Sequence, residues 1–479
     1  MTHPPHLACE LLALKLGKLM ADQAAGDAGV LPRAGEWGRV GVFARWAAPP
    51  IVVMLAALGL SVYARFGYGY PWCANGNDEL FWATIISSRF ESYYYPSSGA
   101  AFVWLAQALV SLSGWQAADV IAYIGLLSIA PIVLLTYSVY RRWDAQRAGL
   151  ILLVLSTTAY FWTPLVESKP QQWGQVIALL GAWLFLACLR GRVNWAWLML
   201  CAGVLALVHI LSFAVLTALC AWIWLVFLLR GRTRLREGGM SALAFAPGAL
   251  FVAWPGGPYG LSIAAVLQDH IQNPYGVFGV ILCILGLLLL ALLVFRHQLR
   301  QSLLGQRDPL RRLCAAVNGP VMLAALLVIS VCLIFQALLL PPDYWQMYGN
   351  SPLRFMLAQS GNLLFLALTL VGVWLASRQL VAGNLHHSLD DALVMVVGCA
   401  VMGLMGLGVT VSMLDNNWFL RIASYTVLFA APLAALGAER VMELKVKGAP
   451  GAARLLIGAA AMLSALLAVR WPGLVSCPI

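Results

Sequence analysis

The chain has 479 residues, of which 62% are hydrophobic and only 10% charged, and its mean hydropathy is +0.83. Apolar runs long enough to cross a bilayer as helices recur from about residue 47 onward. This composition excludes a sizeable soluble domain and predicts an all-α polytopic membrane protein.

The predicted elements begin with a cytoplasmic N-terminal segment, residues 1–44. Within it, residues 7–21 have the pattern of an amphipathic helix on the membrane surface, and their apolar run is too broken for the core of a signal peptide. A misplaced start codon is the other explanation of this segment.

Residues 45–479 are expected to form one transmembrane domain. A length of about 20 apolar residues per span gives about thirteen helices. Their centres lie roughly at residues 56, 128, 157, 182, 202, 221, 247, 286, 327, 367, 402, 432 and 462. A closed β-barrel is excluded, because stretches such as residues 277–296 lack the alternation of apolar and polar side chains that barrel strands need.

The basic residues support this topology. With a cytoplasmic N-terminus, 24 of the 30 Lys and Arg fall on the cytoplasmic side of alternate connections, as the positive-inside rule requires. The net charge of +11 is therefore a topology signal and gives no reason to expect nucleic acid as a partner. The bases left on the outer side are Arg65, Arg89, Lys169, Arg354, Arg421 and Arg470.

The first outer loop, residues 66–115, contains the adjacent carboxylates Asp78 and Glu79. Residues 78–90 and 99–113 are too short to span the bilayer, so we expect two helices lying along the interface. Asp78 would then cap the first helix, and Glu79 would interact favourably with its dipole. The alternative is that this acidic pair takes part in chemistry at the rim of the membrane.

Other polar residues reach the same face by the parity of the spans. Glu167 and Lys169 lie in the connection of about ten residues between the third and fourth spans, and His209 ends the fifth span. Arg354 and Arg421 lie in or beside later outer loops. The simple interpretations are that Glu167 and Lys169 form a local ion pair, that His209 is a hydrogen-bonded structural residue, and that Arg421 contacts lipid headgroups. Positive charge is sparse on this face, however, so each base is also a candidate ligand for an anionic substrate.

In these features the chain resembles the GT-C class of integral-membrane glycosyltransferases, which use polyprenyl-phosphate-linked sugars. The resemblance covers the chain from about residue 45 onward. It is carried by the Asp78-Glu79 pair soon after the first span, the large first outer loop, the connection at residues 167–170, the His209 helix end and the run at residues 417–421.

The resemblance implies transfer of a sugar from a polyprenyl-phosphate donor to a lipid, glycan or protein acceptor. We expect this at the outer face of a bacterial inner membrane, or its topological equivalent, among membrane lipids. Asp78, with Glu79, would be the acceptor-side base, and bases would hold the lipid phosphate. The implied substrate-binding residues are Glu167, Lys169, His209, Arg354 and Arg421. First-loop acids help to bind a divalent metal in some members, but two adjacent carboxylates are an incomplete ligand set, so no cofactor is established.

A polytopic transporter or flippase of lipid-linked sugars is the main alternative. Such proteins keep ionisable groups near the bilayer midplane and often show internal repeats or broken helices. Here the predicted spans hold almost no charge and no repeat is apparent, which favours an outer-face enzyme. A polytopic ligase or polymerase would normally need a larger late outer loop than this chain has. The remaining interpretation is that the protein is a structural membrane subunit.

Overall fold

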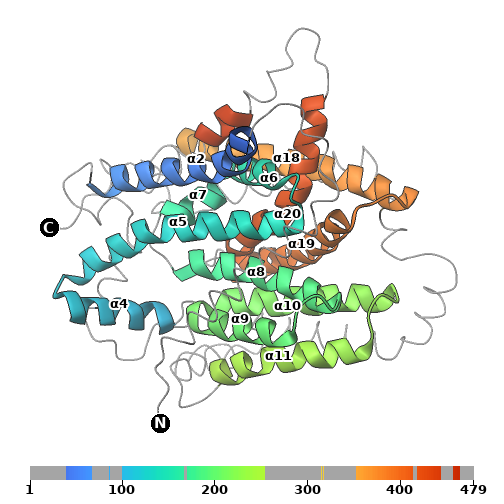
Figure 1. Cartoon of the computed structure of the whole chain (residues 1–479), viewed down its shortest axis with the longest axis horizontal. Helices are drawn as coiled ribbons and strands as arrows, with labels where there is room; N and C mark the ends of the chain where they lie inside the picture. Colours follow the sequence, from blue (N-terminus) through green and yellow to red (C-terminus); the bar gives the residue numbers. More distant parts are fainter. Residues whose placement is uncertain are drawn as a thin grey trace, which may run out of the picture. The chain divides into compact units, whose positions relative to one another are not determined.

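The computed structural model describes residues 39–66, 86, 100–166, 170–253, 314, 317, 352–413, 418–443 and 457–463. These residues are helical apart from short connections, and no strand occurs among them, so the all-α prediction is confirmed for this part of the chain (Figure 1). The chain divides into two units, Met1–Ala48 and Pro49–Ile479. The contacts below all lie within the second unit.

The helices of the described residues vary in length from two turns to more than eight. In chain order they are α2 (Arg39–Phe66), α4 (Ala100–Ser113), α5 (Ala117–Trp143), α6 (Ala148–Leu155), α7 (Ala159–Val166), α8 (Pro170–Leu189), α9 (Trp195–Val208), α10 (Ile210–Leu229), α11 (Leu235–Ala253), α18 (Pro352–Ala382), α19 (His387–Met413) and α20 (Trp418–Glu443). Residues 457–463 are also helical.

Among the described residues, four helical stretches are long and apolar enough to cross a membrane: Ala117–Trp143, Pro170–Leu189, Ile210–Leu229 and Gly361–Ala382. They contain the predicted centres 128, 182, 221 and 367. The centres at 56, 202, 247, 402, 432 and 462 also fall on helical residues, whereas 286 and 327 lie outside the described part of the chain. The membrane prediction is therefore supported by apolar helices.

The span expected around residue 157 is not one helix. It consists of α6 and α7, each eight residues long and separated by residues 156–158. The hydroxyl groups of Ser156 and Thr157 donate to the carbonyl oxygens of Leu153 and Val154, at 2.6 and 2.8 Å. Hydroxyl side chains that bond to nearby backbone carbonyls compete with helical continuity, which hydropathy does not detect.

The connection after α7 is also shorter than expected. Helix α7 continues to Val166 and α8 begins at Pro170, so residues 167–169 alone separate them. Proline suits the first position of a helix, because its missing N–H would have no intrahelical acceptor there. The second interfacial helix, expected at 99–113, occurs as α4 at Ala100–Ser113. The first, at 78–90, lies outside the described residues except for the helical Ile86.

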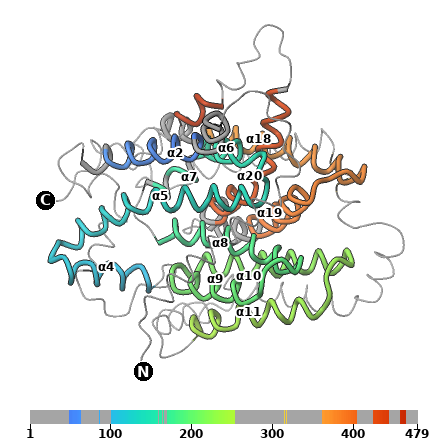
Figure 2. Tube along the Cα trace, in the orientation of Figure 1, coloured from blue at the N-terminus to red at the C-terminus, as the bar shows by residue number. Residues whose placement is uncertain are grey.

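Helices α8 to α11 form two successive helical hairpins related by an offset of 40 residues. Helices α8 and α10 begin at Pro170 and Ile210, and α9 and α11 begin at Trp195 and Leu235. The four helices pack on one another, and Figure 2 shows them side by side. The expectation that the chain lacks a repeat is therefore wrong for this region.

The turns of the two hairpins have the same four-residue sequence. Residues 189–192 and 229–232 both read Leu-Arg-Gly-Arg. Gly191 and Gly231 adopt φ of 67° and 69°, the left-handed conformation that favours glycine at the end of a helix. The amides of Arg192 and Arg232 donate back to the carbonyls of Ala187 and Phe227, at 2.9 and 2.8 Å, completing the same hydrogen-bonded cap in each turn.

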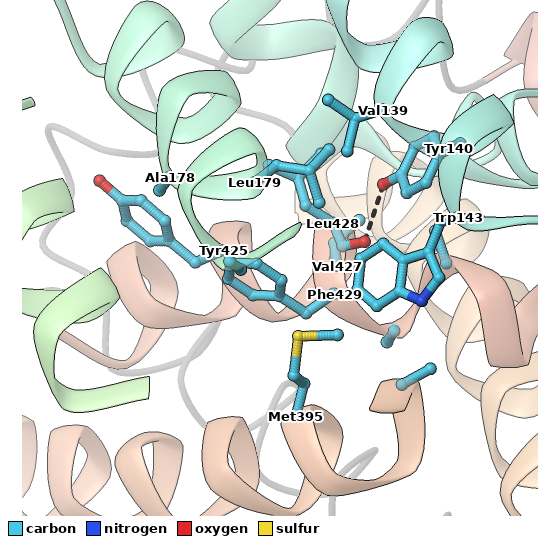
Figure 3. Packing of buried hydrophobic residues seen from close by; sticks show 14 of the residues in the cluster. Val139, Tyr140, Trp143, Ala178, Leu179, Met395, Tyr425, Val427, Leu428 and Phe429 are labelled. Carbon is cyan, nitrogen blue, oxygen red and sulfur yellow. Dashed lines mark hydrogen bonds between the residues drawn. The ribbon is translucent and has the colours of Figure 1, made fainter. Parts of the chain in front are cut away.

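The core is centred on α20, which packs against α18, α19 and α6. Tyr425 and Phe429 on this helix are almost completely buried. The Tyr140 hydroxyl of α5 donates to the carbonyl oxygen of Leu428 at 2.7 Å (Figure 3). These contacts hold α20 against the helices that carry the polar residues described below.

Candidate functional site

His209 is the single residue between α9 and α10 and serves both helices. Its backbone is extended, with φ −161° and ψ 110°, and its amide donates to Leu205 at the end of α9. Its imidazole Nδ1 accepts the amide of Ser212 at 3.2 Å, which caps the start of α10. His209 therefore ends helix α9, the helix predicted as the fifth span, and it caps α10.

The imidazole also belongs to a buried cluster of hydroxyl groups. Ser212 Oγ lies 2.8 Å from His209 Nδ1 and 2.6 Å from the hydroxyl of Tyr425, which itself lies 3.3 Å from Nδ1. A backbone amide can only donate, so Nδ1 is an acceptor and the neutral ring carries its proton on Nε2. We call His209, Ser212 and Tyr425 the imidazole cluster.

Helix α8 packs closely on this cluster through Gly174. A Cβ atom at position 174 would lie 2.7 Å from the Cβ of His209 and 3.0 Å from that of Ser212. The side chain at this position must therefore be hydrogen. The close approach brings the start of α8 to the break between α9 and α10.

Two glutamines extend the polar region from α8 to α20. The Nε2 group of Gln175 donates to the hydroxyl oxygen of Ser424 at 2.8 Å, and that of Gln171 does so at 3.4 Å. Ser424 is the neighbour of Tyr425 in α20, so the imidazole cluster and the glutamines meet on one helix. We call this region, with the imidazole cluster, the His209 end of the bundle.

A small cavity lies beside these groups. It is bounded by α5, α7, α8 and α20 and has room for little more than one water molecule. Gln172 lines it, is buried, and its Nε2 group has no hydrogen-bond partner among the described residues. The other lining residues are Ile132, Tyr160, Phe161, Leu165, Gln175, Val176, Ser424, Val427 and Leu428.

Some predicted site residues lie close in the chain to residues of this end. Arg421 lies in the first turn of α20, three residues before Ser424, and Lys169 directly precedes Pro170, the first residue of α8. Arg354 lies in the first turn of α18, about two turns before Asn362, which accepts a hydrogen bond from Thr158 at 2.5 Å. Asp78, Glu79, Glu167 and Lys169 lie outside the described residues, and the roles of these residues stay predictions.

The opposite end of α8 and α10 is charged. We call it the arginine end. Arg190 pairs with Asp391, while Arg230 and Arg232 both pair with Asp390, so the two hairpin turns meet at the first turn of α19. The three arginines are among the 24 basic residues that the predicted topology places on the cytoplasmic side.

A second ion-pair group lies at the start of α6 and is linked to the same helix. Arg147 binds Asp144 and Glu439, each at 2.8 Å, and Asp144 accepts a hydrogen bond from Ser388 at 3.4 Å. Burial lowers the pKa of the Arg147 guanidinium, but its hydrogen bonds to Glu439 and Asp144 more than offset this and raise the pKa above its usual value. Arg147 is therefore a permanent cation.

Sequence reasoning missed the neutral polar residues around His209. Gln171, Gln172 and Gln175 are spaced so that they share one side of the first turns of α8, and amides so close together in an apolar helix are a usable signal. Nothing in the sequence pairs them with Ser424 or Tyr425. In the described ranges, no group of three or more His, Cys, Asp and Glu side chains is placed to hold a metal.

No protein family model matches the chain, and neither the curated proteins nor the solved structures include a similar one.

Proposed function

We propose that the protein transfers a sugar from a polyprenyl-phosphate donor to an acceptor hydroxyl at the His209 end of its helices. The observation that carries the proposal is the neutral, buried polar region at this end, where the first turns of α8 and α20 meet the α9–α10 break. Lys169 and Arg421 adjoin these turns in the chain. Two predicted phosphate ligands thus adjoin residues of this polar region in the sequence.

The predicted site residues have different roles in the reaction. The Asp78 carboxylate takes the proton of the acceptor hydroxyl as its oxygen bonds to the anomeric carbon. The bond between that carbon and the phosphate oxygen breaks, and polyprenyl phosphate leaves as an anion. Lys169 and Arg421 stabilise the negative charge of this leaving group, and His209 contributes to substrate binding. Glu79 shares the role of Asp78, and Glu167 and Arg354 contribute to substrate binding.

The test compares envelope lipids and glycans by mass spectrometry in cells that lack the protein and then regain it. Wild type, Asp78→Asn, Arg421→Gln and the control Arg378→Gln are expressed at equal membrane abundance. Arg378 is an exposed arginine stacked on Trp374, so its variant removes a charge without touching the His209 end. We expect a sugar-sized mass increment to return with wild type and the control, and with neither of the other variants.

Two results would contradict the proposal in different ways. If Asp78→Asn and Arg421→Gln restore the increment, the residue roles are wrong. If wild type restores no increment, the transferase activity is wrong.

Transport of a lipid-linked sugar is the second candidate, because the α6–α7 break and the hairpin repeat are features that transporters often have. Proteoliposomes that hold a lipid-linked sugar and an acceptor distinguish the two functions. A transferase consumes the donor and releases polyprenyl phosphate. A flippase moves the donor between leaflets without breaking the bond to the sugar.

A further inference from the structure

The arginines of the two hairpin turns divide into two groups. Arg190, Arg230 and Arg232 are held by the adjacent carboxylates of α19, Asp390 and Asp391. Three further arginines of the same segments, Arg192, Arg234 and Arg236, are exposed, and their guanidinium groups have no partner among the described residues.

The turns therefore carry a surplus of positive charge. Six arginines in residues 190–236 share this end with three carboxylates, those of Asp390, Asp391 and Glu237. Glu237 accepts the backbone amide of Arg234 at 2.7 Å, which caps α11 and leaves the guanidinium of Arg234 uncommitted. The acid pair thus fixes the two turns, and the remaining arginines face outward.

An apolar surface begins directly after the free arginines. Trp197, which follows Arg192 by five residues, is 46% exposed, and Leu200 is 57% exposed farther along α9. On α11, Leu235 and Leu243 are 59% and 65% exposed. Helices α9 and α11 pack side by side, so their exposed apolar residues extend from the turns that carry the free cations.

We propose that the two turns bind the headgroup of an anionic phospholipid whose acyl chains lie along α9 and α11. Arg192 and Arg234 bind the phosphate, with Arg236 beside them, because guanidinium groups suit phosphate oxygens. Trp197, five residues after Arg192, would lie at the boundary between headgroups and acyl chains, which indole rings favour. A soluble phosphate would use the cations but would leave the apolar surface uncovered, so a lipid satisfies both features. This proposal is independent of the sugar-transfer reaction.

The test measures lipid retention by native mass spectrometry of the full chain. Phosphatidylglycerol and phosphatidylcholine with identical acyl chains are offered in mixed micelles. We expect wild type to retain phosphatidylglycerol preferentially. Arg192→Gln/Arg234→Gln should weaken this retention about 30-fold, because each basic residue near anionic lipid contributes roughly fivefold.

The matched control is Arg142→Gln/Arg378→Gln. It removes two exposed arginines that stack on Trp183 and Trp374, so the loss of charge is the same at other positions. The control should retain phosphatidylglycerol like wild type. An equal loss in the control, or equal retention of the two lipids by wild type, would overturn the proposal.

Two measurements on wild type need no variant. Added salt should reduce retention of phosphatidylglycerol, because the cations are exposed and are screened within about 10 Å at 0.1 M salt; retention that does not respond to salt would contradict the charge-based site. Excess inorganic phosphate should not displace the lipid. Displacement would show that the turns bind a free anion and that the apolar surface has no part in recognition.

Discussion

Buried polar groups are paired differently at the two ends of α8 and α10. At the arginine end, Arg230 and Asp390 have side chains only 2% and 4% exposed and neutralise each other as ions. At the His209 end, the hydroxyl groups of Ser212 and Tyr425 form hydrogen bonds with the imidazole of His209, and none of these three groups is a carboxylate. Removing a partner should cost most where a charge is left behind and least where a neutral hydroxyl is lost.

The largest effect should follow Asp390→Ala, which leaves the buried guanidinium of Arg230 without its carboxylate. We expect a loss of about 3–5 kcal/mol in unfolding free energy, measured as a fall in thermal stability in detergent. The double variant Asp390→Ala/Arg230→Met removes both charges and should recover part of this loss. A double variant less stable than Asp390→Ala would contradict the ion pair as the source of the effect.

The next largest effect should follow Gly174→Ala, because the added methyl group would collide with His209 and Ser212. Overpacking of this kind costs about 1–3 kcal/mol. Gly203→Ala in α9 is the matched control, since nothing lies within 4 Å of a Cβ atom there. Alanine favours a helix over glycine by up to about 1 kcal/mol, so the control should be neutral or stabilising. Equal behaviour of the two variants in thermal unfolding would count against the close packing of α8 on His209.

Gly191→Ala and Gly231→Ala test whether the two hairpin turns are equivalent. Each variant places a side chain in the left-handed conformation, which costs roughly 1–2 kcal/mol. We expect similar losses of thermal stability, because φ is nearly the same in both turns. A loss confined to one variant would show that the turns are alike in geometry only.

The smallest effect on stability should follow Tyr425→Phe, which removes the hydroxyl that bonds to Ser212. The expected loss is about 0.5–1.5 kcal/mol. Tyr140→Phe is the matched control, since it removes a buried tyrosine hydroxyl that bonds to the carbonyl of Leu428. Both should lower thermal stability by similar amounts, and only Tyr425→Phe should reduce the return of the sugar increment in cells. Equal activities of the two variants would show that the imidazole cluster takes no part in the reaction.

Hydropathy predicted the helices where long apolar runs decide the structure, as in α5, α8 and α10. It also predicted the end of α9, because His209 interrupts an apolar run. It failed at Ser156 and Thr157, whose hydroxyl groups bond to the backbone and whose small side chains hardly change the local hydropathy.

Contacts between distant residues were beyond such reasoning. Arg230 and Asp390 are 160 residues apart, and the two residues of the Ser212–Tyr425 pair are 213 apart. Their meeting depends on how whole helices pack. The repeated Leu-Arg-Gly-Arg turns, by contrast, are visible in the sequence, and their spacing was a sufficient signal for the hairpin repeat.

The hairpin repeat also has a consequence for how such a region could arise. A gene duplication of one hairpin would give two copies of a basic turn, each bringing a cation that must be neutralised by another part of the chain. Adjacent acids at 390 and 391 meet this need, one for each turn. A related chain with three such hairpins should carry a third acid on the helix that receives them.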